Sequence, residues 1–205
     1  MRKILVVLFL TCMSSAWGQT FEAWFNGGQS LVSNSGLGSD HPASFGGTSS
    51  DYALEDGFRF SFRMAFNSSE HRFGHEVQYA YTRTKFDSFG TFTPSPPQGM
   101  AVHQGGYNFL YYATQEGTRI RPFVTAGVLF ANYVPPGSSA TGGGGETKFG
   151  FSYGGGVKIK VTSLFGLRID VRQATTPKPF QDQIPFPAGG WIRLTEVSAG
   201  VGVQF

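Results

Sequence analysis

The last residues of the chain, WIRLTEVSAGVGVQF, constrain its fold more than any other stretch. From Val197 to Phe205 every second residue is apolar, and the residues between them are small or polar. A period of two residues is that of a β-strand with one apolar face. Chain ends usually fray, so an apolar strand that runs to a terminal aromatic residue needs a neighbour on each edge. We expect it to pair with the first strand and close a barrel, which has no free edges.

Earlier segments repeat this alternation. In GFRFSFRMAF, phenylalanine or methionine occupies every even position from 58 to 66, opposite Arg59, Ser61, Arg63 and Ala65. An amphipathic helix cannot have this period. With the terminal stretch there are eight predicted strands, which cover residues 21–30, 57–66, 75–85, 102–113, 119–130, 148–161, 166–172 and 191–205.

The connections between these segments alternate between long and short. The long ones are rich in glycine, serine and proline and cover residues 33–53, 86–100, 132–147 and 173–189. Pro94, Pro96 and Pro97 predict that the second long connection lies outside any sheet ladder. Short turns on the periplasmic side and long loops outside are typical of outer-membrane barrels. We therefore predict an all-β, eight-stranded antiparallel up-and-down transmembrane β-barrel with both termini in the periplasm.

Composition agrees with this class. Charged residues make up 14% of the chain, below the ~25% of ordinary globular proteins, and mean hydropathy is only -0.13. After the first twenty residues no apolar run approaches the ~18 that a spanning helix needs. Barrels place their apolar residues at alternate positions, so their average hydropathy stays moderate.

The first residues, MRKILVVLFLTCMSSAWGQ, have the charge order of a secretory signal peptide. Arg2 and Lys3 precede an apolar core, and cleavage is predicted after Gly18. The barrel domain then covers 19–205. The only cysteine, Cys12, would leave with this leader; its lipidation is the alternative, although Thr11 is not the Gly or Ala that such signals favour. Loss of Arg2 and Lys3 lowers the formal net charge from +3 to +1, which gives no reason to expect nucleic acid as a partner.

Three internal stretches carry a family resemblance. RPFVTAGV, FGFSYGGGVKIKV and GLRIDVR resemble the fifth to seventh strands of the small OmpA/OmpX-like outer-membrane β-barrel domains. The end of the chain is similar to the C-terminal insertion signal of such barrels. The resemblance implies that Val201, Val203 and Phe205 form that signal, and that the barrel-assembly machinery is the partner during insertion. It marks an architecture and not an activity.

The polar face is expected to line the lumen, because its glycine runs and its charges of both signs suit the tight interior of a small barrel. A secreted lipocalin-like barrel would have the reverse arrangement, but the phenylalanine- and tyrosine-rich apolar face favours lipid. Buried charges persist when paired, so we predict a charged plug; a narrow, gated, anion-favouring pore is the alternative. Asp170 and Glu196 lie on neighbouring strands and should each be shared by several cations. The predicted lumen network is Arg59, Arg63, Glu76, Arg121, Arg168, Asp170, Arg172 and Glu196, with Glu22, Lys158 and Lys160 on the same face.

Cations beside aromatic residues mark the outward face. Arg83 and Lys85 follow two tyrosines, and Arg193 follows Trp191, towards the predicted external ends of their strands. Such side chains can reach lipopolysaccharide phosphates, so we predict lipopolysaccharide contacts there; solvated rim charges are the alternative.

An enzyme that modifies lipid A is the alternative of a different class. It would need a nucleophile, a base and usually a carboxylate at one level, and the histidines, His41, His71, His75 and His103, form no such set. His71, His75 and Glu76 do not have metal-ligand spacing across a turn, and TGGGGET and YGGGVK lack the remainder of a phosphate loop. We predict a non-enzymatic monomer without cofactor or metal, with a structural or surface-interaction role. An external partner would bind the long loops.

Overall fold

The computed structural model describes residues 19–42, 51–68, 72–88, 95–138 and 144–205. The predicted signal peptide, with Cys12, lies outside the described residues. Within them the chain is almost entirely β-structure, and no helix has the length and apolar character to cross a membrane.

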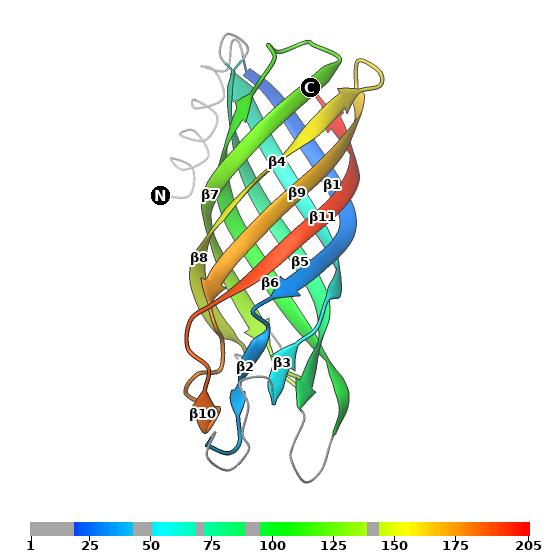
Figure 1. Ribbon diagram of the computed structural model, residues 1–205. Coiled ribbons are helices and arrows are strands. Elements are labelled where there is room, and N and C mark those ends of the chain that lie inside the picture. Colours follow the sequence, from blue (N-terminus) through cyan, green and yellow to red (C-terminus); the bar gives the residue numbers. More distant parts are fainter. Residues whose placement is uncertain (1–18, 43–50, 69–71, 89–94, 139–143) are drawn as a thin grey trace, which may run out of the picture.

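Among the strands of the described residues, eight long ones close an antiparallel barrel (Figure 1). The barrel strands are β1 (Gln19–Ser33), β4 (Gly57–Ser68), β5 (Phe73–Ser88), β6 (Ser95–Tyr112), β7 (Ile120–Val134), β8 (Glu146–Lys160), β9 (Phe165–Pro177) and β11 (Trp191–Gln204). Neighbours in sequence are neighbours in the barrel, and β1 pairs with β11. The predicted eight-stranded up-and-down barrel is therefore confirmed.

The seam between the first and last strands joins the two chain ends. Its register runs from Glu22 opposite Gln204 to Ser33 opposite Arg193. Two backbone hydrogen bonds extend it: Phe205 donates to Phe21 at 2.8 Å, and Phe21 donates to Phe205 at 3.2 Å. Both ends of the described chain thus lie at one end of the barrel, called here the terminal end; the opposite end is the loop end.

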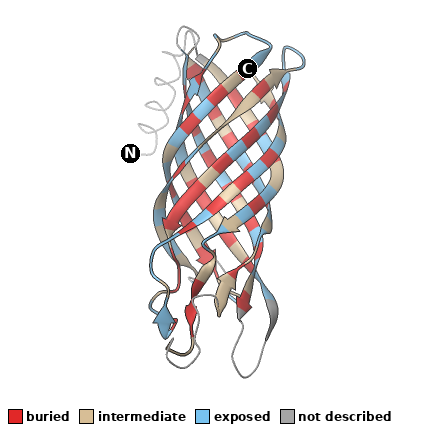
Figure 2. Ribbon diagram, viewed as in Figure 1, coloured by how far each residue is buried: buried red, intermediate tan, exposed pale blue. Residues whose placement is uncertain are grey.

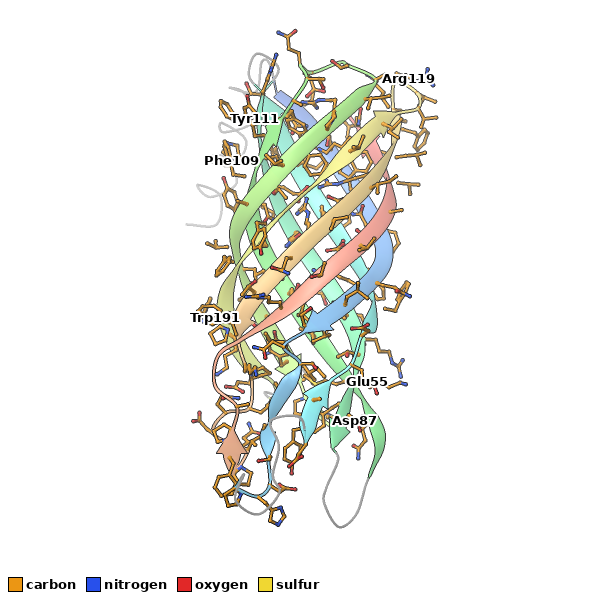
Figure 3. All side chains as sticks on the ribbon, viewed as in Figure 1. Glu55, Asp87, Phe109, Tyr111, Arg119 and Trp191 are labelled. Atoms are coloured by element: carbon orange, nitrogen blue, oxygen red, sulfur yellow. The ribbon has the colours of Figure 1, made fainter. Side chains whose placement is uncertain are left out.

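Alternation decides which side chains face the lumen. Along β4, exposed Phe58, Phe60 and Phe62 alternate with buried Arg59 and Ser61. Buried and exposed residues alternate in the same way over the other barrel strands (Figure 2). The outer wall is therefore apolar and rich in aromatic rings, including Phe109, Tyr111 and Trp191, which project from it in Figure 3.

The loop end contains short strands that the sequence did not predict. β2 (Gly36–Ser39), β3 (Tyr52–Leu54) and β10 (Phe186–Pro187) continue the sheet beyond the barrel in the order β10-β2-β3-β5 (Figure 1). The prediction of strandless connections at 33–53 and 173–189 was wrong here. Strands of two to four residues are too short to show an alternating pattern.

The predicted 86–100 connection is also shorter than expected. β5 continues to Ser88 and β6 begins at Ser95, so Pro96 and Pro97 fall inside a strand. The β5–β6 register shifts between Phe86 and Ser88, and β6 pairs with β7 only from Ala101 onward. Prolines are tolerated there because an irregular strand with one neighbour does not need every backbone N–H.

Candidate functional site: the closed lumen

A network of ion pairs fills the middle of the lumen. Arg63 of β4 donates to Asp170 of β9 and to Glu196 of β11, each at 2.6 Å. All three side chains are almost completely buried. One guanidinium thus bridges two acids on neighbouring strands and forms a charge-assisted hydrogen bond with each carboxylate.

Each acid is shared by more than one arginine. Asp170 also contacts Arg168 at 2.6 Å and Arg172 at 3.3 Å. Glu196 accepts from Arg59 at 2.9 Å and from Ser198 at 2.7 Å.

Glu76 belongs to the same network, although it lies on β5, across the lumen from β9. Its carboxylate binds Arg168 at 2.6 Å and Arg172 at 2.7 Å. Arg59, Arg63, Arg168 and Arg172 face Asp170, Glu76 and Glu196, so four positive charges meet three negative ones and one positive charge is left in excess.

A second group of charged and aromatic side chains lies in the terminal end of the lumen. Lys158 forms an ion pair with Glu22 and a 2.6 Å hydrogen bond with the Tyr112 hydroxyl. Its ammonium lies 5.6 Å from the centre of the Trp24 ring and 5.8 Å from that of Phe123. Cations near aromatic faces are attracted to them. The rings also fill the lumen, since all three aromatic side chains are buried.

Arg121 lies at the same end, nearer to the β6–β7 turn. Its guanidinium lies 3.8 Å from the Tyr112 ring centre and 2.6 Å from the carboxylate of Glu116 in the β6–β7 turn. Arg121 is the one member of the predicted network that forms no ion pair with the other members among the described residues. Its nearest lumen acid is Glu22, at 3.8 Å. Lys160 is only half-buried.

The loop-end part of the lumen is apolar, contrary to the polar interior expected. Inward-facing residues of the barrel strands meet residues of the long loops in one cluster, which is Leu37, Leu54, Met100, Val102, Leu129, Ala131, Tyr133, Ala174, Phe180, Ile184, Ile192 and Leu194. The 178–190 loop places Phe180 and Ile184 in the mouth of the barrel. A signal was present in the sequence: Ile192 and Leu194 share the face of Glu196, yet are apolar.

Two titratable groups outside the barrel strands, at the loop end, have shifted pKa values. Burial and a hydrogen bond to Asp40 raise the pKa of Tyr52 to about 12. Burial lowers the pKa of the Lys178 ammonium. Nearby, the Glu146 carboxylate accepts a hydrogen bond from the Phe180 backbone, which holds the loop over the mouth.

The outward cations do not form one site. Arg83 and Lys85 are exposed on β5, and Lys85 lies 3.6 Å from Glu55 (labelled in Figure 3). Arg193 is exposed on β11, with β4 and β1 between. Of the predicted insertion signal, Val201 and Phe205 are exposed on the outer wall and Val203 is half-buried.

The strand histidines pair with tyrosines on the outer wall. His75 Nδ1 hydrogen-bonds the Tyr107 hydroxyl, and His103 Nδ1 lies 2.7 Å from the Tyr79 hydroxyl. Neither contact joins a histidine to a serine or a carboxylate. Within the part of the chain that the structure describes, no group of three or more histidine, cysteine or acidic residues could hold a metal ion.

Replacing Lys158 by methionine is expected to destabilise the barrel more than replacing both Lys158 and Glu22, by methionine and glutamine. The single change leaves the buried Glu22 carboxylate with only the more distant Arg121, at 3.8 Å, as an ion-pair partner within the described residues, whereas the double change removes the charge of the carboxylate as well. Urea unfolding of both variants measures the difference. A double variant that is less stable than the single one would contradict this account.

Comparisons with known proteins agree with this architecture. No curated protein sequence matches the chain. Similar solved structures include OprG from Pseudomonas aeruginosa, with TM-score 0.61 and 11% identity over 92% of this chain and 96% of that chain. Neisserial surface protein A has TM-score 0.56 and 18% identity over 92% and 99% of the two chains. A major outer membrane protein from Thermus thermophilus has TM-score 0.56 and 11% identity over 91% and 99%.

At these identities the structural likeness shows the fold alone. The family is shown by the sequence, since the model described as "outer membrane protein beta-barrel domain" matches residues 4–205. The chain therefore belongs to the outer membrane protein β-barrel domain family, whose members lie in the bacterial outer membrane.

Proposed function

We propose that this protein is a closed, non-catalytic barrel with a structural or surface-interaction role. The short strands β2, β3 and β10, called here the loop-end sheet, would lie on the cell surface. The observation that carries the proposal is the filling of the lumen at three levels. Rings around Lys158 fill the terminal end, the Asp170 network fills the middle, and the apolar cluster fills the loop end. Filled lumens are expected of eight-stranded barrels.

The proposed orientation places both termini in the periplasm. Its support is the contrast between the two ends. The connections at the terminal end are short, whereas the loop end carries β2, β3 and β10 beyond the barrel. Outer-membrane barrels have short periplasmic turns and longer external loops. An external partner would then meet the loop-end sheet, and the assembly machinery would meet the last strand.

A narrow pore is the second candidate, and unpartnered lumen atoms favour it. Asn26, Gln104, Asn108 and Thr125 have buried side-chain polar atoms without a hydrogen-bond partner among the described residues. Such groups usually bind water, so part of the lumen is expected to be wet. A wet lumen is not an open one, because the apolar cluster and the Lys158 group lie at its two ends.

Planar-bilayer recording of the purified protein separates these candidates. A closed barrel is expected to give no current steps, and Asp170→Asn is expected to give none either, because both end groups remain in place. Discrete, anion-favouring steps in the unmodified protein would replace the closed-barrel proposal by the pore.

A further inference from the structure

We propose that the outer wall over β5–β8 holds one phosphate-bearing, acylated membrane lipid, the chemical class of lipid A. Its acyl chain would lie in an apolar groove lined partly by glycines, and its phosphate would lie beside Arg83. This inference rests on the proposed orientation, which puts Arg83 in the outer leaflet, and it is independent of whether the lumen conducts.

The groove lies over four adjacent strands, and exposed side chains of the outer wall line it together with Gln78 and Leu129, which are buried. It has a volume of about 690 Å³, within the ~300–1,000 Å³ of sites that hold small ligands, and its lining is almost wholly apolar. Val77, Tyr107 and Val128 line one side, and Phe130 and Phe149 line the other.

Three glycines, Gly105, Gly106 and Gly150, lie in the lining of this depression. Gly105 stands opposite Tyr79 on one neighbouring strand and Phe130 on the other. A Cβ at Gly105 would lie 2.4 Å from the Phe130 ring, so the ring occupies the space of the missing side chain. The ring therefore packs over β6, and the trough that it lines is apolar, which suits a flexible hydrocarbon chain.

Arg83 lies further towards the loop end of the same wall, between two hollows. One has a volume of about 280 Å³ and lies between Arg83, Tyr81 and the start of the β7–β8 connection at Pro135 and Ser138. The other, of about 460 Å³, contains Lys85 and Asp56. The first hollow has no carboxylate in its lining, so it is the better place for a phosphate.

The guanidinium of Arg83 is free to bind an anion. Among the described residues no acidic side chain forms an ion pair with it, whereas Lys85 already faces Glu55. Arg83 Nη2 lies 4.0 Å from the position that a Cβ on Gly99 would take, so the charge lies over a residue without a side chain. Arginine recognises phosphate through paired N–H groups.

Groove and hollow are spaced for one lipid. Gly105 and Ala101 are four residues apart on β6, which is about 13 Å along a strand. Between them lies the hydrogen-bonded pair of Tyr79 and His103, whose polar atoms face outward. The order along the wall is therefore apolar groove, polar pair, cation, which is the order of acyl chain, linkage and phosphate in a membrane lipid.

The test measures lipid retained by the purified full chain, by native mass spectrometry in detergent. The probes are diphosphorylated lipid A, the same lipid without its phosphates, and inorganic phosphate. The unmodified protein is expected to retain one phosphorylated lipid. Arg83→Gln should weaken that binding about tenfold, since a hydrogen bond to a charged group is worth roughly one decade in affinity or more. The dephosphorylated lipid should bind equally to both.

Two further variants separate the contribution of the Arg83 charge from that of the groove, and one control tests for general surface charge. Gly99→Asp places a carboxylate beside Arg83, in space that the structure leaves open, and should abolish the preference for the phosphorylated lipid. Val128→Phe narrows the groove from an exposed position and should weaken both lipids. Arg119→Gln removes another exposed cation, which lies at the terminal end and lines neither hollow, and should change nothing.

Three outcomes would overturn the proposal. Equal losses of lipid binding in Arg83→Gln and Arg119→Gln would mean that general surface charge, and not a site at Arg83, holds the lipid. If millimolar inorganic phosphate displaces the lipid and Val128→Phe still binds it normally, Arg83 belongs to a site for free phosphate and the groove takes no part. No dependence on the lipid phosphates would mean that Arg83 takes no part. None of these results bears on the closed lumen, which the bilayer recording tests separately.

Discussion

Replacing Asp170 by asparagine is expected to lower the free energy of unfolding by about 3–5 kcal/mol, the cost of breaking a buried ion pair by removing one partner. Asp170 is completely buried and contacts Arg63, Arg168 and Arg172. The network already holds one positive charge in excess, so loss of this carboxylate raises the excess to two. Asparagine keeps the volume, and the effect is therefore one of charge and not of a cavity.

Urea unfolding in lipid vesicles measures this effect. Asp182→Asn is the matched control, because Asp182 is exposed in the 178–190 loop and should change stability by less than about 0.5 kcal/mol, as surface substitutions usually do. Adding Arg63→Gln to Asp170→Asn should cost less than the sum of the two single changes, since the residues are in contact. Equal unfolding midpoints for Asp170→Asn and Asp182→Asn would mean that the lumen charges are independently solvated.

The sequence predicts much of this network because a barrel imposes a strict period of two. Arg168, Asp170 and Arg172 follow one another on one face of a single strand, and Glu196 pairs opposite Arg172 in the neighbouring strand. Local alternation and strand order are sufficient for these contacts. The bond from Glu76 to the arginines of β9 crosses the lumen, and its level depends on the stagger of the closed barrel, which no local pattern specifies.

The chemistry of the lumen ends was harder to predict. Trp24 shares a face with Glu22 and Asn26, and an aromatic residue on a polar face suggested no particular role. The structure shows that this ring packs beside Lys158. The apolar cluster at the loop end needs Phe180 and Ile184 from a connection without periodicity, so its position follows only from tertiary packing.

Deleting Phe205 is expected to reduce the amount of protein inserted in the outer membrane severalfold. The deletion removes both backbone hydrogen bonds to Phe21 and the ring contact at 6.1 Å between the two phenylalanines. These contacts hold the first pairing of the seam that closes the barrel, and an unclosed seam exposes two strand edges to lipid. The control is Phe165→Ala, which removes a similarly exposed ring from β9 near the same end. Equal loss in both variants would mean that any exposed ring at this end has the same importance.

Phe205→Ala separates the two roles of this residue. It keeps the backbone hydrogen bonds that close the seam but removes the exposed ring. The ring is the part of the residue that an assembly factor could recognise. If the ring is a recognition signal, Phe205→Ala should insert poorly in cells and normally into preformed lipid vesicles, where no assembly factor is present. The deletion should insert poorly in both. Normal insertion of Phe205→Ala in cells would leave seam closure as the sole function of the residue, because the backbone alone would then account for the effect of the deletion.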